Sequence, residues 1–167
     1  MKSDRLLRWL NIGANLAVLG GLIFVGVQVR DGRAAAEAQV ADGIADGFLQ
    51  LNIVGISDPE VACLWIGGLA SPDSLDVVDA ARFSLYIRGV FNQFERVQRQ
   101  FDTGLADDDT WSIVANEAAW LLTTPGGRAH FAGNPLSADF LQALEPFRAS
   151  PTESNMTLGR TPPPDCQ

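Results

Sequence analysis

An uncharged run of 21 residues, from Trp9 to Val29, constrains this chain more than any other feature. A helix rises about 1.5 Å per residue, so the run spans roughly 30 Å, the thickness of the hydrocarbon core of a bilayer. Arg8 and Arg30 bracket the run, and Trp9 stands where an interfacial aromatic residue is expected. Its polar residues lie toward its ends: Asn11, Asn15 and Gln28. We therefore expect a membrane anchor with basic flanks in residues 1–33.

Two other interpretations fit the same run. A cleaved signal peptide is one, because Ala36-Glu37-Ala38 resembles an A-x-A cleavage site and basic residues precede the run. The run is long for a signal peptide, however, and Arg30, Asp31 and Arg33 separate it from that site. A buried core helix is the other, but a helix that is apolar all round is unusual in so small a chain.

The charge is distributed unevenly along the sequence. The chain has 12 Lys and Arg against 20 Asp and Glu, a formal charge of −8. Residues 1–33 hold five basic and two acidic residues (+3), which leaves seven basic and 18 acidic residues (−11) for the remainder. The acidic remainder argues against nucleic acid as a partner. The basic N-terminus favours a cytoplasmic start, but by so few charges that the side of the soluble domain stays open.

Small residues recur every four positions within the expected span, at Gly13, Ala17 and Gly21. Such a stripe lets two membrane helices approach closely. Glycine and alanine are also common in membrane helices that do not associate. We expect the lipid bilayer as a partner, and another membrane helix or protein as a further one.

Beyond the anchor the sequence predicts only helices. Apolar residues recur at steps of three or four from Val40 to Leu51, so the anchor is expected to continue into the first soluble helix. Asp58 and Pro59 are typical of a helix start. The strongest apolar stripe predicts a helix of roughly 25 residues, capped by Asp76 and stopped at Gly104, at the centre of the core. The stripe comprises Phe83, Tyr86, Val90, Phe94, Val97 and Phe101.

Two further helices and a tail complete the expected architecture. One helix is capped by Asp107 or Asp108, and Thr124-Pro125-Gly126-Gly127 then reads as a type II turn. The other begins at Ser137. The fold class is therefore all-α: a transmembrane helix, then a bundle of four or five helices in residues 34–148. The Pro-rich residues 149–167 are expected to be a disordered tail.

Several short sequence motifs, typical of helix ends and turns, are shared with a known group of proteins. They are Val27-Gln28-Val29-Arg30, Asp58-Pro59-Glu60 with Leu64-Trp65 and Gly68-Leu69, Phe94-Glu95, and Pro125-Gly126-Gly127-Arg128. Over residues 10–148 the chain resembles a family of uncharacterised bacterial proteins with one N-terminal span and a small helical domain. The resemblance implies a single-pass protein of the bacterial inner membrane and no catalytic residue. It also implies an aromatic residue in many members at the position of His130.

Few residues carry recognisable chemistry. His130 is the chain's one histidine and Cys63 and Cys166 are its two cysteines, so a Cys63–His130 dyad has no support from spacing. A Cys63–Cys166 disulfide is open as well, but nothing in the sequence supports it. Asp107-Asp108-Asp109 lacks the pattern of a calcium loop and suits a helix N-terminus instead. Gly126-Gly127-Arg128 is a weak signal for an anion site. We expect no metal, no cofactor and no catalytic set.

One polar cluster on the long helix offers an alternative. Long polar side chains gather beside the apolar stripe, and the cluster comprises Arg88, Asn92, Glu95 and Arg99. An exposed face with Glu95–Arg99 pairs explains them, and so does a groove in which Glu95 binds Arg88 or Asn92. We therefore expect a membrane-tethered interaction or scaffold module. The alternative is an enzyme or small-ligand binder with a pocket around Glu95 and Arg88.

Overall fold

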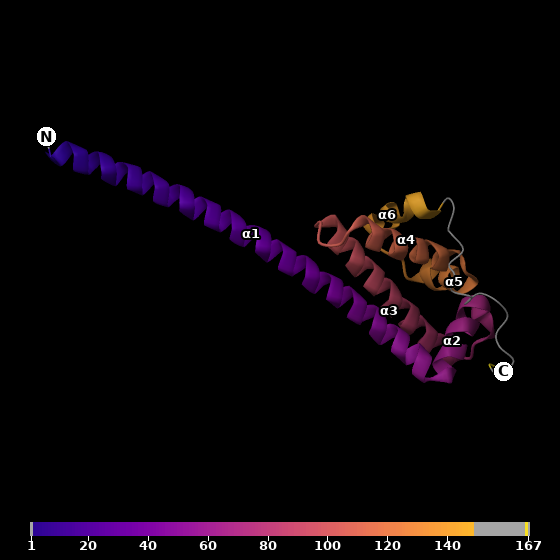
Figure 1. The fold of residues 1–167 in the computed structure, drawn as a ribbon. Helices are drawn as coiled ribbons and strands as arrows, with labels where there is room; N and C mark the ends of the chain where they lie inside the picture. Colours follow the sequence, from indigo (N-terminus) through magenta and orange to yellow (C-terminus); the bar gives the residue numbers. More distant parts are fainter. Residues whose placement is uncertain (1, 149–165, 167) are drawn as a thin grey trace. The chain divides into compact units, whose positions relative to one another are not determined.

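The fold is all-α. The structure, a computed structural model, describes residues 2–148 and residue 166, without the side chains of residues 2–12, 54 and 56 (Figure 1). Within these residues there are six α-helices, one short 3-10 helix and no strand. The helices are α1 (Lys2–Ser57), α2 (Pro59–Ala70), η1 (Pro72–Ser74), α3 (Val77–Asp102), α4 (Asp108–Thr123), α5 (Pro125–Gly133) and α6 (Ala138–Arg148). The predicted fold class, a long apolar helix followed by a helical bundle, is confirmed.

Contacts divide the chain into two units, Met1–Gln39 and Val40–Gln167. The first unit is the larger part of α1. Its large described apolar side chains are exposed, with Ile23 69% and Phe24 61% accessible, and none of its most apolar 18-residue window is buried. Within the described residues this part of the helix is therefore not buried. The helix is long and apolar enough to cross a membrane.

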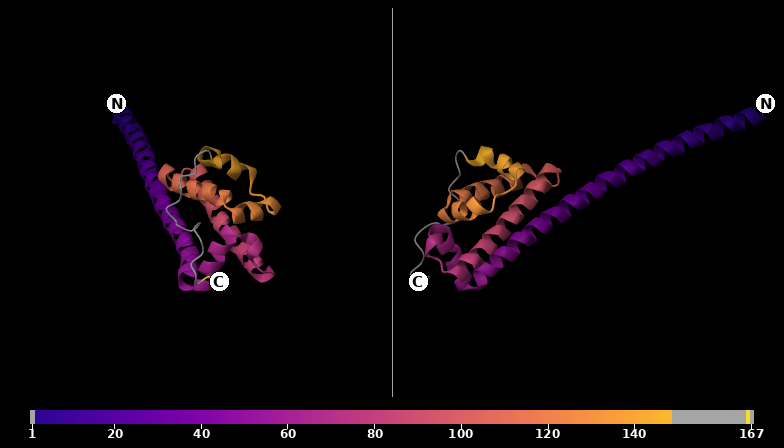
Figure 2. Two further views of the ribbon diagram at one scale, coloured as in Figure 1. Left: turned by 90° about the vertical axis from the view of Figure 1, so that its right-hand side faces the viewer. Right: turned by 180° about the vertical axis from the view of Figure 1, so that it is seen from behind.

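The end of α1 belongs to the second unit, the helical domain. The prediction that the anchor helix continues into the first soluble helix is confirmed, because α1 runs unbroken to Ser57. In this domain Val40–Ser57 runs along α3 (Figure 1 and the right-hand view of Figure 2). The rings of Phe48 and Phe94 are 5.9 Å apart, and the Tyr86 hydroxyl donates a 2.8 Å hydrogen bond to the Leu51 carbonyl.

Helix α3 is the centre of the core, as its apolar stripe predicts. Phe83, Phe94 and Val97 are buried, while Tyr86, Val90 and Phe101 are half-buried. Ile87, Phe91 and Val97 have no exposed surface, and the first two of them lie outside the predicted stripe. They widen the apolar face because α3 packs against α2, α4 and α6 rather than against one neighbour.

Side-chain caps fix most of the helix starts. Asp58, Asp76 and Asp107 each accept a backbone N–H from the first turn of α2, α3 and α4, as predicted. Helix α3 ends at Asp102, and Gly104 adopts a positive φ of 69° just beyond it.

The expected type II turn at Thr124 is wrong. Pro125 is the first residue of α5, where its missing N–H costs nothing, and the Thr124 hydroxyl accepts the Gly127 N–H at 3.0 Å. Thr124 is therefore a helix cap. At α6, Ser137 caps the helix start as expected, and Pro146 lies inside the last turn without ending it.

The expected disordered tail, 149–167, lies outside the described residues except for Cys166. That residue forms a disulfide with Cys63 on α2.

Candidate functional site

The polar cluster holds the connection between α5 and α6. The Arg88 guanidinium donates to the Asn134 carbonyl at 2.8 Å and lies 5.2 Å from the centre of the Phe131 ring. Seven residues further along α3, a Glu95 carboxylate oxygen accepts the Ser137 N–H at 3.4 Å. Two charged side chains of α3 thus bind the two ends of one loop. Arg88 and Glu95 do not form a hydrogen bond or ion pair with each other.

The other two members of the cluster do not complete a pocket. Asn92 and Arg99 are exposed, whereas Arg88 and Glu95 are half-buried. The two apolar hollows described below contain none of the four side chains in their linings. The cluster thus consists of two side chains that contact the loop and two that face outward.

His130 lies next to this loop, with a serine as its neighbour. Its Nδ1 is 3.1 Å from the Ser84 hydroxyl, and its ring meets Phe131 edge-on. Burial, and then the positive charge of Arg88, lower the pKa of His130 below its usual 6.5. A neutral imidazole therefore predominates at neutral pH. Within the described residues its Nε2 is buried without a hydrogen-bond partner.

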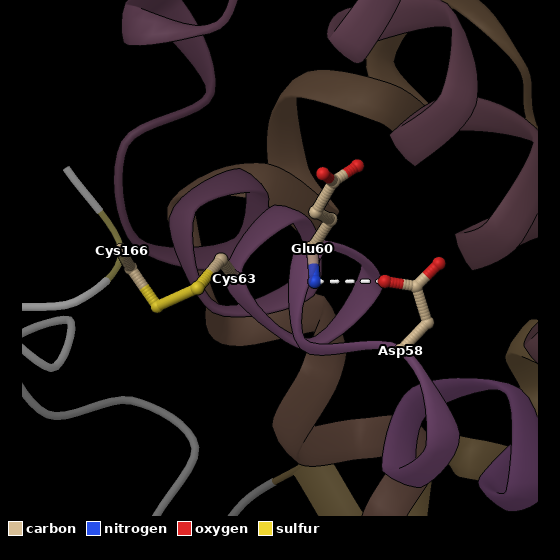
Figure 3. The surroundings of a disulfide bond; sticks show 4 residues. All are labelled: Asp58, Glu60, Cys63 and Cys166. Carbon is tan, nitrogen blue, oxygen red and sulfur yellow. Dashed lines mark hydrogen bonds between the residues drawn. A yellow bond between two sulfur atoms is a disulfide. The ribbon is translucent and has the colours of Figure 1, made fainter.

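The dyad of Cys63 with His130 is excluded by the disulfide. Cys63 carries no free thiol, because its sulfur is bonded to Cys166 (Figure 3). A nucleophile of the cysteine class needs a thiolate. Neither cysteine of this chain is free in the structure.

An apolar hollow lies between the end of α1 and helices α2, α3 and α4. We call it the apolar hollow, and its volume is about 430 Å³. That volume lies in the range of ligand-binding cavities, roughly 300–1,000 Å³. Aromatic and branched side chains dominate its lining, which includes Phe48, Trp65, Tyr86, Phe94, Ile113 and Leu121. Its polar lining is small and includes Asn52 and Glu117.

A second apolar depression adjoins the hollow. It has a volume of about 360 Å³ and shares Trp65 and Tyr86 with the apolar hollow. These two rings meet edge-on at 5.1 Å and form the wall between the depressions. Burial raises the pKa of the Tyr86 phenol above 10.0, so its hydroxyl stays a donor to Leu51. Exposed apolar side chains lie at the margins, with Ile113 71% and Leu85 76% accessible.

Sequence reasoning missed this hollow as a site. Tyr86, Phe94 and Trp65 were correctly expected on apolar helix faces, where the same residues ordinarily fill a core. What distinguishes the hollow is an apolar residue, Ile113, that stays exposed on its helix. The sequence alone does not reveal this exposure.

The other sequence candidates are placed as follows. Gly13 and Gly21 have open space around them, and Ala17 is exposed. No other described segment packs against this small-residue stripe. In the acidic triplet, Asp107 is the cap of α4, and hydrogen bonds from Thr110 lower its pKa. At the Gly pair, the Gly127 N–H is already bonded to Thr124. Among the described residues no three His, Cys, Asp or Glu gather as metal ligands.

Comparison with protein-family models, with curated proteins and with solved structures finds no match for this chain. The resemblance to a bacterial single-span family therefore stays a prediction from the sequence.

Proposed function

We propose that this protein is a single-pass, membrane-tethered interaction module of the bacterial inner membrane. Its helical domain binds a partner protein through the apolar hollow. The observation that carries the proposal is the aromatic lining of the hollow together with the exposed Ile113 at its margin. Apolar surface of this kind on a soluble domain is typical of a binding surface. The N-terminal helix, long and apolar enough to cross a membrane, supplies the tether.

The alternative, an enzyme or ligand binder centred on Glu95 and Arg88, has less support. Both side chains bond backbone groups of their own chain, at Ser137 and Asn134. A substrate would have to displace these contacts. The partner-binding interpretation requires no such rearrangement.

The test compares two exposed aliphatic residues. Ile113→Glu places a charge at the margin of the hollow, where Ile113 is 71% accessible. Val77→Glu places one at a position that is 88% accessible and lines neither apolar depression. The full chain is purified from detergent-solubilised membranes after cross-linking, and co-purified proteins are quantified by mass spectrometry. We expect a partner that is retained by wild type and Val77→Glu and reduced at least about tenfold in Ile113→Glu, since tenfold corresponds to about 1.4 kcal/mol.

Two results would count against the proposal. One is a set of co-purified proteins that Ile113→Glu leaves unchanged. The other is loss of a bound small molecule or partner on Glu95→Gln with no effect of Ile113→Glu, which would favour the alternative site.

A further inference from the structure

We infer that the helical domain lies on the oxidising side of the membrane, with the N-terminus on the reducing side. On the oxidising side, a thiol oxidant that itself carries a disulfide forms the Cys63–Cys166 bond. This inference goes beyond the proposed function, because an interaction module could face either side.

The first argument is the use of cysteine. The chain has two cysteines, and both are joined in one disulfide. Stable disulfides form in oxidising compartments such as the bacterial periplasm and are rare where glutathione and thioredoxin keep thiols reduced. The two positions are 103 residues apart, unlike the short spacing of a Cys-x-x-Cys redox motif. Their pairing therefore points to a structural bond rather than a catalytic one.

The second argument is the position of the bond in the fold. Cys63 lies in the second turn of α2, a helix fixed at its start because the Asp58 carboxylate accepts the Glu60 N–H at 2.9 Å (Figure 3). Cys166 lies 103 residues further along the chain. The bond thus ties a distant segment to a helix of the core. A tie of this kind holds only where the disulfide persists.

The third argument is independent of the cysteines. The segment before the span carries Lys2, Arg5 and Arg8 with Asp4 among them, whereas Arg30 and Arg33 follow the span with Asp31 between them. The positive-inside rule favours the more basic end on the cytoplasmic side. By itself this margin is small, but it selects the same orientation as the disulfide. A single span then places everything after Arg33 on the opposite side.

The oxidation step balances with one partner. The Cys63 and Cys166 thiols lose two protons and two electrons as their sulfur–sulfur bond forms. The electrons reduce the disulfide of the oxidant to a dithiol, by way of a mixed disulfide between the two proteins. No metal or further co-reactant is needed.

The redox state is tested by thiol trapping. Cells that express the full chain are quenched in acid and alkylated with a maleimide that adds visible mass, with and without prior reduction. We expect no added mass without reduction and two additions after it. Cys63→Ser is expected to show one addition without reduction, because Cys166 then has no partner. Free thiols in the quenched wild type would overturn the inference.

Sidedness is tested with matched single-cysteine variants. Cys63→Ser keeps only Cys166, on the domain side. Ser3→Cys in a Cys63→Ser, Cys166→Ser background places the one thiol before the span. Spheroplasts are treated with a membrane-impermeant maleimide before and after lysis. We expect the first variant to react before lysis and the second only after it. The reverse pattern, or a domain thiol that reacts only after lysis, would overturn the inference without affecting the partner test at Ile113.

Discussion

At the scale of single residues, short-range hydrogen bonds decide where helices begin. Asp76 accepts two backbone N–H groups of α3, and Asp107 accepts the Thr110 N–H at 2.8 Å. These bonds join residues two or three apart, so the sequence was sufficient to predict them. Long-range contacts were not predictable in the same way. The Arg88–Asn134 bond joins residues 46 apart, and only the packing of α5 beside α3 brings them together.

Protonation of Asp107 is expected to weaken the start of α4. Hydrogen bonds from Thr110 lower its pKa below 3.8, so its stabilising contribution is complete above that pH and is lost as the pH falls through the lowered value. Asp107→Asn keeps a capping side chain but cannot titrate. The difference in melting temperature between wild type and this variant, followed by circular dichroism, should therefore shrink as the pH falls below 3.8. A difference that does not change with pH would contradict this.

At the scale of elements, apolar periodicity was enough to predict α3 but not its full buried face. Ile87 and Phe91 are completely buried because three helices surround α3. At Thr124, by contrast, the local sequence predicted the wrong element. Pro followed by Gly favours a turn locally, yet the same residues make a helix start when a threonine caps them and the backbone of α2 lies close. Tertiary packing decided between two local possibilities.

That packing predicts a contrast between two glycines of α5. A Cβ on Gly126 would collide with the backbone of Gly68 and Leu69 on α2, whereas a Cβ on Gly133 would have nothing within 4 Å. Gly126→Ala should lower the free energy of unfolding by about 1–3 kcal/mol, because backbone cannot move aside easily. Gly133→Ala should be neutral or stabilising by up to about 1 kcal/mol. Urea unfolding of both variants provides the measurement, and equal effects would rule out close α2–α5 packing.

At the scale of the whole molecule, the chain combines an apolar N-terminal helix with an acidic helical domain that is closed by a disulfide. The long apolar helix was predictable because its 21 uncharged residues leave few alternatives. The pairing of Cys63 with Cys166 was open, because no local pattern relates positions 103 residues apart. The apolar hollow was not predictable, since it depends on how four helices fail to fill the space between them.

Loss of the disulfide should destabilise the domain through the unfolded chain. A bond that closes so long a loop restricts the unfolded state, and its removal is expected to cost about 2–4 kcal/mol. Urea unfolding of the full chain in detergent, with and without a reductant, measures this cost. Cys63→Ser and the double variant with Cys166→Ser should match the reduced wild type. An unchanged urea midpoint on reduction would show that the bond adds no stability.

The central claim is that the N-terminal helix stays attached and holds the domain at a membrane. Alkaline carbonate extraction of cell membranes, with mass spectrometry of the N-terminal peptides, tests it most directly. The account predicts protein that remains in the membrane pellet and still contains the peptide from Trp9 to Arg30. A carbonate-soluble chain that begins after Ala38 would contradict it, because a cleaved signal peptide would then explain the apolar run.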